Sequence, residues 1–197
     1  MTSNAVQEMQ TKLDRILLVM DEVIASNNAL IKRIANEGKE VKEEKKIYTP
    51  ESQLTKNFKL RDLIRSKRAI VEGIDNMPSD EGIESLIRLC ENILQPVRDH
   101  YGVPILPNSG YRSPLLNSRT PNASKMSQHM KGQAVDFEVP GIKNIDLARW
   151  IVNNTYFDQL ILEFYDGIDP HSGWVHCSYV SEEENRNIAL TTCDGIK

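Results

Sequence analysis

Two histidines and one aspartate in the second half of the chain are of types that bind metal ions. His129 and Asp136 lie within the polar segment Ser127–Asp136, and His176 follows much later. Three nitrogen and oxygen ligands that leave a fourth position open are what a catalytic zinc ion requires. Glu163 adds a further carboxylate between them, of the kind that acts as a general base. The residue types and their order therefore predict a catalytic zinc site.

Each of these residues also has an ordinary structural role open to it. His129 could be a surface histidine in a polar loop, and His176 a half-buried histidine held by hydrogen bonds. Glu163 could pair with a lysine, and Arg112 could hold a loop through backbone carbonyls. Asp136 is harder to explain in this way, because a carboxylate inside an apolar strand needs a cation or donors to offset its desolvation. Taken singly, the residues leave both interpretations open.

Three segments with alternating apolar and polar residues are expected to position the candidates. They are residues 133–139, 159–165 and 174–180. Asp136, Glu163 and His176 each fall on the face opposite the apolar side chains. Asp-Gly and Ser-Gly pairs between the last two segments favour a hairpin with a long loop. An antiparallel sheet packed on helices by one side would present all three residues on its other side.

Helices are expected around these strands. Ser79 has the character of an N-cap, and apolar residues recur on one face from Ile83 to Val97. Asn144 is expected to cap a second helix. The short apolar run Val103–Leu106 predicts a strand, and the polar tail after Ser181 carries no recognisable motif.

The N-terminal 46 residues have the repeat of a coiled coil. Apolar residues alternate four and three apart, with Asn27 at one a position. The a and d positions are Met9, Leu13, Ile16, Met20, Val23, Asn27, Leu30 and Ile34, and the pattern can extend to Val6 and Val41. A further apolar row at e, Leu17, Ile24 and Ile31, widens the stripe and suits a trimer or docking on another protein. Asn27 either fixes register or marks a break, and the helix either self-associates as a dimer or trimer or folds back on its own domain.

A charged block from residue 37 to 46 and the pair Thr49-Pro50 indicate the end of this helix. These features divide the chain into an oligomerisation helix (residues 1–46), a linker (47–53) and a catalytic domain (54–197). The length of 197 residues and the apolar content of 40% fit one globular domain with an extension.

Composition argues against several other classes of protein. A net charge of −4 gives no reason to expect nucleic acid or an anionic membrane as partner. Three cysteines, Cys90, Cys177 and Cys193, without a CxxC pair argue against a disulfide framework or a thiolate zinc site. Neither a signal peptide nor a stretch of membrane-spanning length is evident, so synthesis in the cytoplasm is expected.

The motifs resemble those of a known peptidase family. Ser127-Xaa-His-Xaa-Xaa-Gly-Xaa-Ala-Xaa-Asp136 followed by Trp174-Xaa-His176 is similar to the signature of the D-alanyl-D-alanine carboxypeptidase family of zinc peptidases. That family includes vancomycin-resistance dipeptidases and phage L-alanyl-D-glutamate endolysins, and it shares its fold with hedgehog signalling domains. The segment Ser109–Pro114 resembles the family's Ser-Gly-Tyr-Arg-Ser motif. The resemblance covers roughly Leu54–Val180 and implies an α+β fold, a small antiparallel sheet with helices on one face, preceded here by the coiled-coil helix.

The resemblance implies a role for each matching residue. His129, Asp136 and His176 would ligate one Zn²⁺ per chain. Arg112 would bind a substrate carboxylate or carbonyl, a task suited to its planar fork of donors. Ser127 would contribute to the substrate-binding side of the site and steady the ligand loop.

The general base is the point at which this chain departs from a common family pattern. Many members place a glutamate three residues before the last histidine, where this chain has Gly173. Glu163, on the preceding strand and on the same face as His176, is the better candidate, and His171 is the alternative. Glu163 would take a proton from the attacking water, while zinc activates that water and polarises the scissile carbonyl.

The resemblance implies a peptidase that cleaves peptidoglycan stem peptides, as a DD-carboxypeptidase or an endopeptidase. An oligomerising N-terminus and the lack of a signal peptide suit an enzyme carried by a bacteriophage particle, docked on other virion proteins, or released by lysis. The alternative is a structural or binding protein of a virion that keeps the zinc-peptidase fold without turnover. The residues do not decide which peptide bond is cleaved.

Overall fold

The structure, a computed structural model, describes residues 2–37 and 46–193 and divides into two compact units, Met1–Ile47 and Tyr48–Lys197. Among the expected coiled-coil positions, Val41 lies outside the described residues, and the side chains of Val6 and Ile34 lie outside them too. No helix in the described part of the chain has the length and apolar character that crossing a membrane requires.

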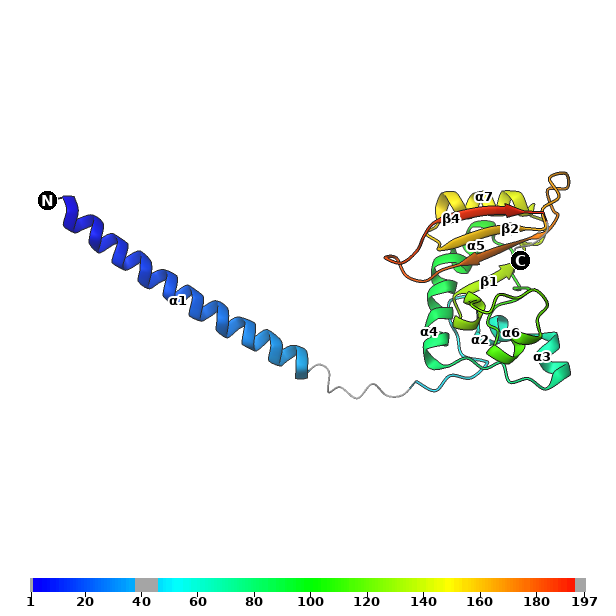
Figure 1. The fold of residues 1–197 in the computed structure, drawn as a ribbon, viewed down its shortest axis with the longest axis horizontal. Coiled ribbons are helices and arrows are strands. Elements are labelled where there is room, and N and C mark those ends of the chain that lie inside the picture. Colours follow the sequence, from blue (N-terminus) through cyan, green and yellow to red (C-terminus); the bar gives the residue numbers. More distant parts are fainter. Residues whose placement is uncertain (1, 38–45, 194–197) are drawn as a thin grey trace. The chain divides into compact units, whose positions relative to one another are not determined.

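The first unit contains one uninterrupted helix, α1 (Thr2–Glu37) (Figure 1). No glycine or proline occurs within it, which permits a helix of this length. Its described apolar side chains are exposed, from 49% at Leu13 to 72% at Met9. The long N-terminal helix is thus confirmed. Its assembly into a coiled coil stays a prediction, favoured by the exposure of a continuous apolar stripe.

The second unit is an α+β domain, as the sequence predicts (Figure 1). Its helices are α2 (Leu60–Ile64), α3 (Lys67–Glu72), α4 (Asp80–Leu89), the π-turn η1 (Cys90–Leu94), α5 (Gln95–Tyr101), α6 (Pro114–Arg119), the 3₁₀ turn η2 (Gln128–Lys131) and α7 (Asn144–Asn154). Its strands are β1 (Ala134–Phe137), β2 (Gln159–Glu163), β3 (Trp174–Ser178) and β4 (Ile188–Thr192).

The strands form one sheet in the order β1-β3-β2-β4. β3 pairs antiparallel with both β1 and β2, so the expected hairpin is present. β4 pairs parallel with β2, so the sheet is mixed rather than wholly antiparallel as expected. The fourth strand comes from the polar tail, and its alternation is weak because an edge strand buries little: Ile188 and Leu190 are each 39% exposed.

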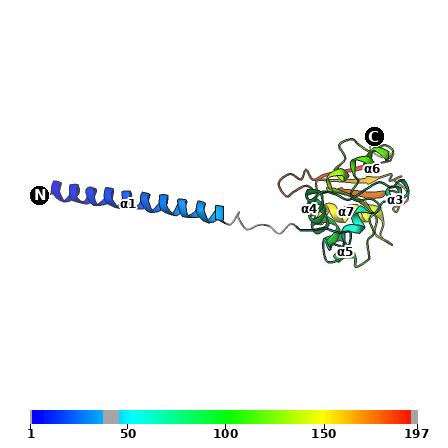
Figure 2. The same ribbon diagram turned by 90° about the horizontal axis from the view of Figure 1, so that it is seen from below.

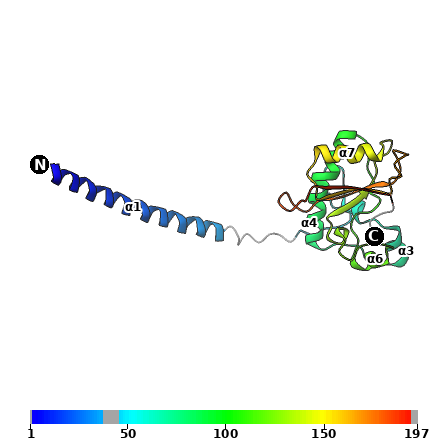
Figure 3. The same cartoon turned by 45° about the horizontal axis from the view of Figure 1, so that its top comes forward.

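Helices cover the apolar face of this sheet. Val135, Leu162 and Val175 point into a core shared with α4, η1 and α7. Figure 2 shows α5 and α7 on the side of the strands away from α6, and Figure 3 shows the sheet between α7 and α6. The opposite face is left for the candidate site.

Two expectations about individual elements were wrong. Val103–Leu106 is not a strand; Pro104 within the run and Pro107 directly after it lack the N–H donors that a ladder needs. Asn144 is not the N-cap of α7, which is Lys143. Instead, the Asn144 amide donates to the carbonyls of His171 and Gly173, each at 2.8 Å, and so holds the β2–β3 loop against the start of α7.

The amphipathic helix expected after Ser79 runs through α4, η1 and α5. Pro96 cannot donate a hydrogen bond to the preceding turn, and the helix widens into a π-turn just before it. Cys90, at the start of this turn, is fully buried in the core. Burial raises the pKa of its thiol, in keeping with the expected packing role.

The expected linker, residues 47–53, is in part packed on the domain. Tyr48 contacts the core, and its hydroxyl donates to Glu84. Glu51 forms ion pairs with Lys59 and Arg61. The chain therefore joins the domain from Tyr48 onward.

Asp158 is a buried carboxylate that ties several segments together. Arg186 Nε and Nη2 donate to its two oxygens at 2.7 and 2.6 Å. Gln128 and Ser178 donate to it as well, at 2.8 and 3.1 Å. Hydrogen bonds from Arg186 hold the pKa of Asp158 well below its usual range, against the opposing effect of burial. One side chain thus links the beginning of β2, the end of β3, the η2 turn and the segment before β4.

Replacing this carboxylate tests its contribution to stability. Asp158→Asn is expected to lower the free energy of unfolding at pH 7 by about 2–4 kcal/mol, because it leaves a guanidinium without its charged partner. The folded-state pKa is depressed, so the contribution is complete above the unfolded value of about 3.9 and decreases as the pH falls below it. Urea denaturation at pH 7 and pH 3 should show the difference from wild type narrowing in acid. Asp146→Asn, which removes an exposed ion pair with Arg149, is the control and should change stability by less than about 1 kcal/mol. A difference independent of pH would contradict this role.

Candidate metal centre

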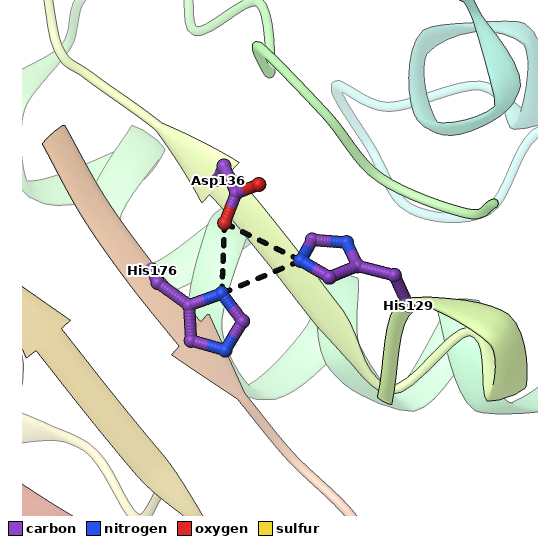
Figure 4. Close-up of side chains that lie close together, drawn as sticks. All are labelled: His129, Asp136 and His176. Atoms are coloured by element: carbon purple, nitrogen blue, oxygen red, sulfur yellow. Dashed lines mark hydrogen bonds and ion pairs between the residues drawn. The ribbon is translucent and has the colours of Figure 1, made fainter. Parts of the chain in front are cut away.

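Three side chains from separate elements converge on the open face of the sheet (Figure 4). His129 comes from η2, Asp136 from β1 and His176 from β3. Asp136 and His176 are paired directly across the β1–β3 ladder, so their side chains project on the same side. The alternation of the sequence predicts this arrangement, and the register produces it.

The ligand atoms lie at distances that suit a metal ion. His129 Nε2 is 3.3 Å from both Asp136 Oδ1 and His176 Nδ1. In a tetrahedral site with bonds of about 2.0–2.1 Å, neighbouring ligand atoms are about 3.3 Å apart. His176 Nδ1 and Asp136 Oδ1 are closer, at 2.7 Å, a hydrogen-bond distance. Two imidazole nitrogens and one carboxylate oxygen form a donor set typical of catalytic zinc, so these residues could hold the ion.

The backbone fixes which nitrogen of His129 faces the site. His129 Nδ1 is 2.7 Å from the carbonyl oxygen of Gly110, which can only accept a hydrogen bond. Nδ1 therefore carries a proton, and Nε2 is the nitrogen that faces Asp136 and His176. The ring is 2% exposed, and this burial lowers the pKa of His129. Once Nε2 has lost its proton, its lone pair is free to bind a metal.

Asp136 is held as a carboxylate by its neighbours. Burial alone would raise its pKa, but the charge and hydrogen bonds of His129 and His176 outweigh burial and lower it. Its side chain is 15% exposed. This environment agrees with the expectation from the sequence that a carboxylate in an apolar strand needs a cation or hydrogen-bond donors beside it.

The segment Ser109–Ser113 has a supporting role that the sequence did not reveal. Ser109 exchanges backbone hydrogen bonds with Asp136, at 2.7 and 3.2 Å. Gly110 contributes the carbonyl that orients His129, and Arg112 N–H donates to the His129 carbonyl at 3.1 Å. Backbone atoms of this segment therefore hold two of the three candidate ligands in place, independently of the Arg112 side chain.

Two glycines in these motifs are required by close packing. A Cβ at Gly110 would lie 2.2 Å from the carbonyl oxygen of Leu63. A Cβ at Gly132 would lie 2.4 Å from the carbonyl oxygen of Gly82, and Gly132 also has a φ of +69°. Gly132 ends the η2 turn against the first turn of α4, which sets where His129 lies.

Glu163 lies on the same face as the triad, at the end of β2. It pairs with Trp174 across the β2–β3 ladder, two rows from His176. Burial and the nearby charge of Asp136 raise the pKa of Glu163, while His176 and Arg112 oppose that change. A carboxylate with a raised pKa is a better proton acceptor near neutral pH than an ordinary surface glutamate.

Gly173 stands where many members of the resembling family have a glutamate, and close packing explains why this chain has glycine there. Gly173 has a φ of +71°, and a Cβ there would lie 1.8 Å from the carbonyl oxygen of Glu163. The position that carries the base in many family members therefore cannot hold a glutamate in this hairpin. Glu163, whose backbone occupies that space, brings a carboxylate from the opposite strand instead.

Arg112 and Ser127 contact each other beside the triad. Arg112 Nη2 donates to Ser127 Oγ at 3.3 Å, while Arg112 Nε is buried and has no hydrogen-bond partner. Ser127 thus steadies the guanidinium rather than a ligand.

An open groove of about 590 Å³ brings the candidates together. All six residues selected from the sequence line it: Arg112, Ser127, His129, Asp136, Glu163 and His176. His171, the alternative base, is exposed in the β2–β3 loop and is not part of the groove lining. Arg186 lines the groove, and sequence reasoning missed it because the polar tail shows no motif.

The donor set predicts one zinc ion per chain. His176→Ala should lower zinc affinity by more than about 100-fold, because losing a partner that merely orients a ligand already costs about 10–100-fold. Competition with a chromophoric chelator measures both stoichiometry and affinity. His171→Ala is the matched control and should bind zinc as the wild type does. Unchanged zinc binding in His176→Ala would place the metal elsewhere.

Comparison with known protein families identifies the family of this chain. The family model for peptidase M15 matches residues 56–178, which include the candidate ligands, Glu163 and Arg112. No curated protein matches the chain. Because the matched segment covers more than half of its residues, the chain belongs to the peptidase M15 family of zinc-dependent metallopeptidases.

Proposed function

We propose that this protein is a zinc-dependent peptidase that cleaves peptidoglycan stem peptides. The observation that carries the proposal is the groove, in which the His-Asp-His triad, Glu163 and Arg112 open onto the same space. A binding protein with the same fold would have no need for a half-buried carboxylate of raised pKa beside the triad.

His129, Asp136 and His176 would hold the ion. When bound, Zn²⁺ supplies Lewis acidity to water and to the scissile carbonyl. Glu163 is positioned to accept a proton from the attacking water and to deliver it to the leaving nitrogen. The four side chains come from the sheet and from a turn clamped to it, so little reorganisation would be needed on substrate binding.

Arg112 would anchor the substrate. Its guanidinium lies close enough to Asp136 and Glu163 to interact with both charges, and its buried Nε has no protein acceptor. A substrate carboxylate or carbonyl would supply that acceptor and form a charge-assisted hydrogen bond. Resemblance to D-alanyl-D-alanine peptidases supports a substrate that contains D-amino acids, for either carboxypeptidase or endopeptidase action.

The N-terminal helix would deliver the domain as part of an assembly. Its exposed apolar stripe suits self-association into a dimer or trimer, or docking on a larger particle such as a phage virion. Such delivery would bring a wall hydrolase to its substrate, on the particle or after lysis.

Removing the proposed base tests the mechanism. Glu163→Gln keeps the size of the side chain but removes the proton acceptor, and kcat should fall by at least about 100-fold. Zinc content should stay at one per chain, because Glu163 is outside the triad. Mass spectrometry of stem peptides incubated with the zinc-loaded protein measures the cleavage.

Glu91→Gln makes the same chemical change on an exposed helix position and should leave turnover intact. Cleavage by Glu163→Gln at the wild-type rate would exclude Glu163 as the base. Zinc-loaded wild type that cleaves no stem peptide would favour a non-catalytic structural or binding protein.

Self-association can be tested in the full-length protein by analytical ultracentrifugation. Ile16→Asp combined with Val23→Asp places charges at two d positions and should convert an oligomer to a monomer. Ala25→Asp with Ala29→Asp makes the same change outside the a, d and e rows and should leave the oligomer intact. A wild type that sediments as a monomer would refute the proposal.

A further inference from the structure

Arg186 belongs to the site although it lies outside the family-matched segment. The match ends at residue 178, and Arg186 follows in the connection to β4. Its side chain is 51% exposed and lines the same groove as Glu163 and Arg112. The C-terminal extension therefore adds a second guanidinium to the groove.

Asp158 holds this guanidinium by one edge only. Nε and Nη2 of Arg186 donate to the two carboxylate oxygens in the bidentate arrangement. Nη1 has no protein partner among the described residues, and it is not buried. A planar fork fixed at one edge presents its other edge in a defined direction with little loss of side-chain entropy on binding.

The two arginines of the groove have different charged neighbours. Arg112 interacts electrostatically with Asp136 and Glu163. Arg186 is tied to Asp158, next to Ser178 at the end of β3. Ser178 is two residues from His176, a step of about 6.6 Å along a strand.

Asp158 offsets part of the charge of Arg186 but leaves the guanidinium accessible. The Asp158 carboxylate is 2% exposed and also accepts from Gln128 and Ser178. Arg186, in contrast, is 51% exposed and lines the groove, so it can still donate to a ligand there.

We infer that Arg186 forms a second anion subsite and that the preferred substrate is a peptide with a second carboxylate. This inference rests on the proposed peptidase function and specifies which peptides the enzyme prefers. One carboxylate or carbonyl binds Arg112, the scissile bond lies at the triad, and the second carboxylate binds the free edge of Arg186. From the spacing of the strand rows, that carboxylate belongs to a residue one or two positions from the scissile bond, about 3.3–3.6 Å per residue in an extended chain.

A pair of synthetic stem peptides tests the subsite in the full-length, zinc-loaded protein. The two peptides differ only in a free carboxylate or a carboxamide one or two residues from the cleaved bond, on each side in turn. Wild type should cleave the acid with a kcat/KM about tenfold higher than the amide, mainly through KM, since one charge-assisted hydrogen bond is lost in the amide. Arg186→Gln should bring the ratio close to one, and Arg186→Lys should restore part of it.

A purely structural role of Arg186 predicts a different result. Loss of positioning alone would lower kcat/KM for acid and amide alike and leave their ratio unchanged, which would overturn the inference. Asp158→Asn keeps the guanidinium but releases the edge that the carboxylate holds, so the acid-to-amide ratio should fall between those of wild type and Arg186→Gln. A ratio equal to that of wild type, at full zinc content, would contradict the orienting role of this ion pair.

Binding measurements separate this inference from the proposed catalysis. Calorimetry of the same peptides with zinc-loaded Glu163→Gln gives the acid-to-amide ratio without turnover. A tenfold ratio that Arg186→Gln abolishes would support the subsite even if wild type cleaves neither peptide. Equal affinity for both peptides would overturn the subsite while leaving the peptidase function standing, and binding of neither would overturn both.

Discussion

The cross-strand pair of Asp136 and His176 is the contact on which the candidate site depends. Neighbouring strands place the two residues directly opposite each other, 2.7 Å apart at Oδ1 and Nδ1. A carboxylate this far from water requires compensation, and the two imidazoles supply it. The ladder that sets their spacing is continuous with the sheet that carries the core, so the fold and the ligand geometry are determined by the same backbone hydrogen bonds.

The third ligand depends on backbone carbonyls and glycines rather than on strand register. His129 lies in a turn whose position is set by Gly132 against the start of α4, and whose ring is oriented by the carbonyl of Gly110. Both glycines sit where a side chain would collide with backbone atoms. Gly173 does the same in the β2–β3 hairpin, beside Glu163. At each of these glycines, two backbone segments lie closer together than any side chain would allow, and a candidate site residue is positioned by that contact.

Strand periodicity made much of this site predictable from the sequence. The alternation around Asp136, Glu163 and His176 predicts their shared face, and the register confirms it. Residue type selected His129, and the family resemblance added the role of Arg112; periodicity could identify neither. Contacts that depend on tertiary structure could not be predicted: Asn144 looks like a helix cap but holds the hairpin loop, and β4 has the composition of a polar tail. Arg186 was missed for the same reason, since its position follows from Asp158, which is remote in sequence.

The two units of the chain differ in how their apolar residues are used. The core of the domain, from Leu54 to Tyr179, is made entirely of residues in the second unit. The described apolar side chains of α1 are exposed, which is the basis for the proposal that this helix associates with a partner. The extension that carries Arg186 differs in this respect, because β4 joins the sheet next to the strand that holds Glu163. Because Arg186 precedes β4 and lines the groove, the proposed second subsite depends on how β4 pairs with β2.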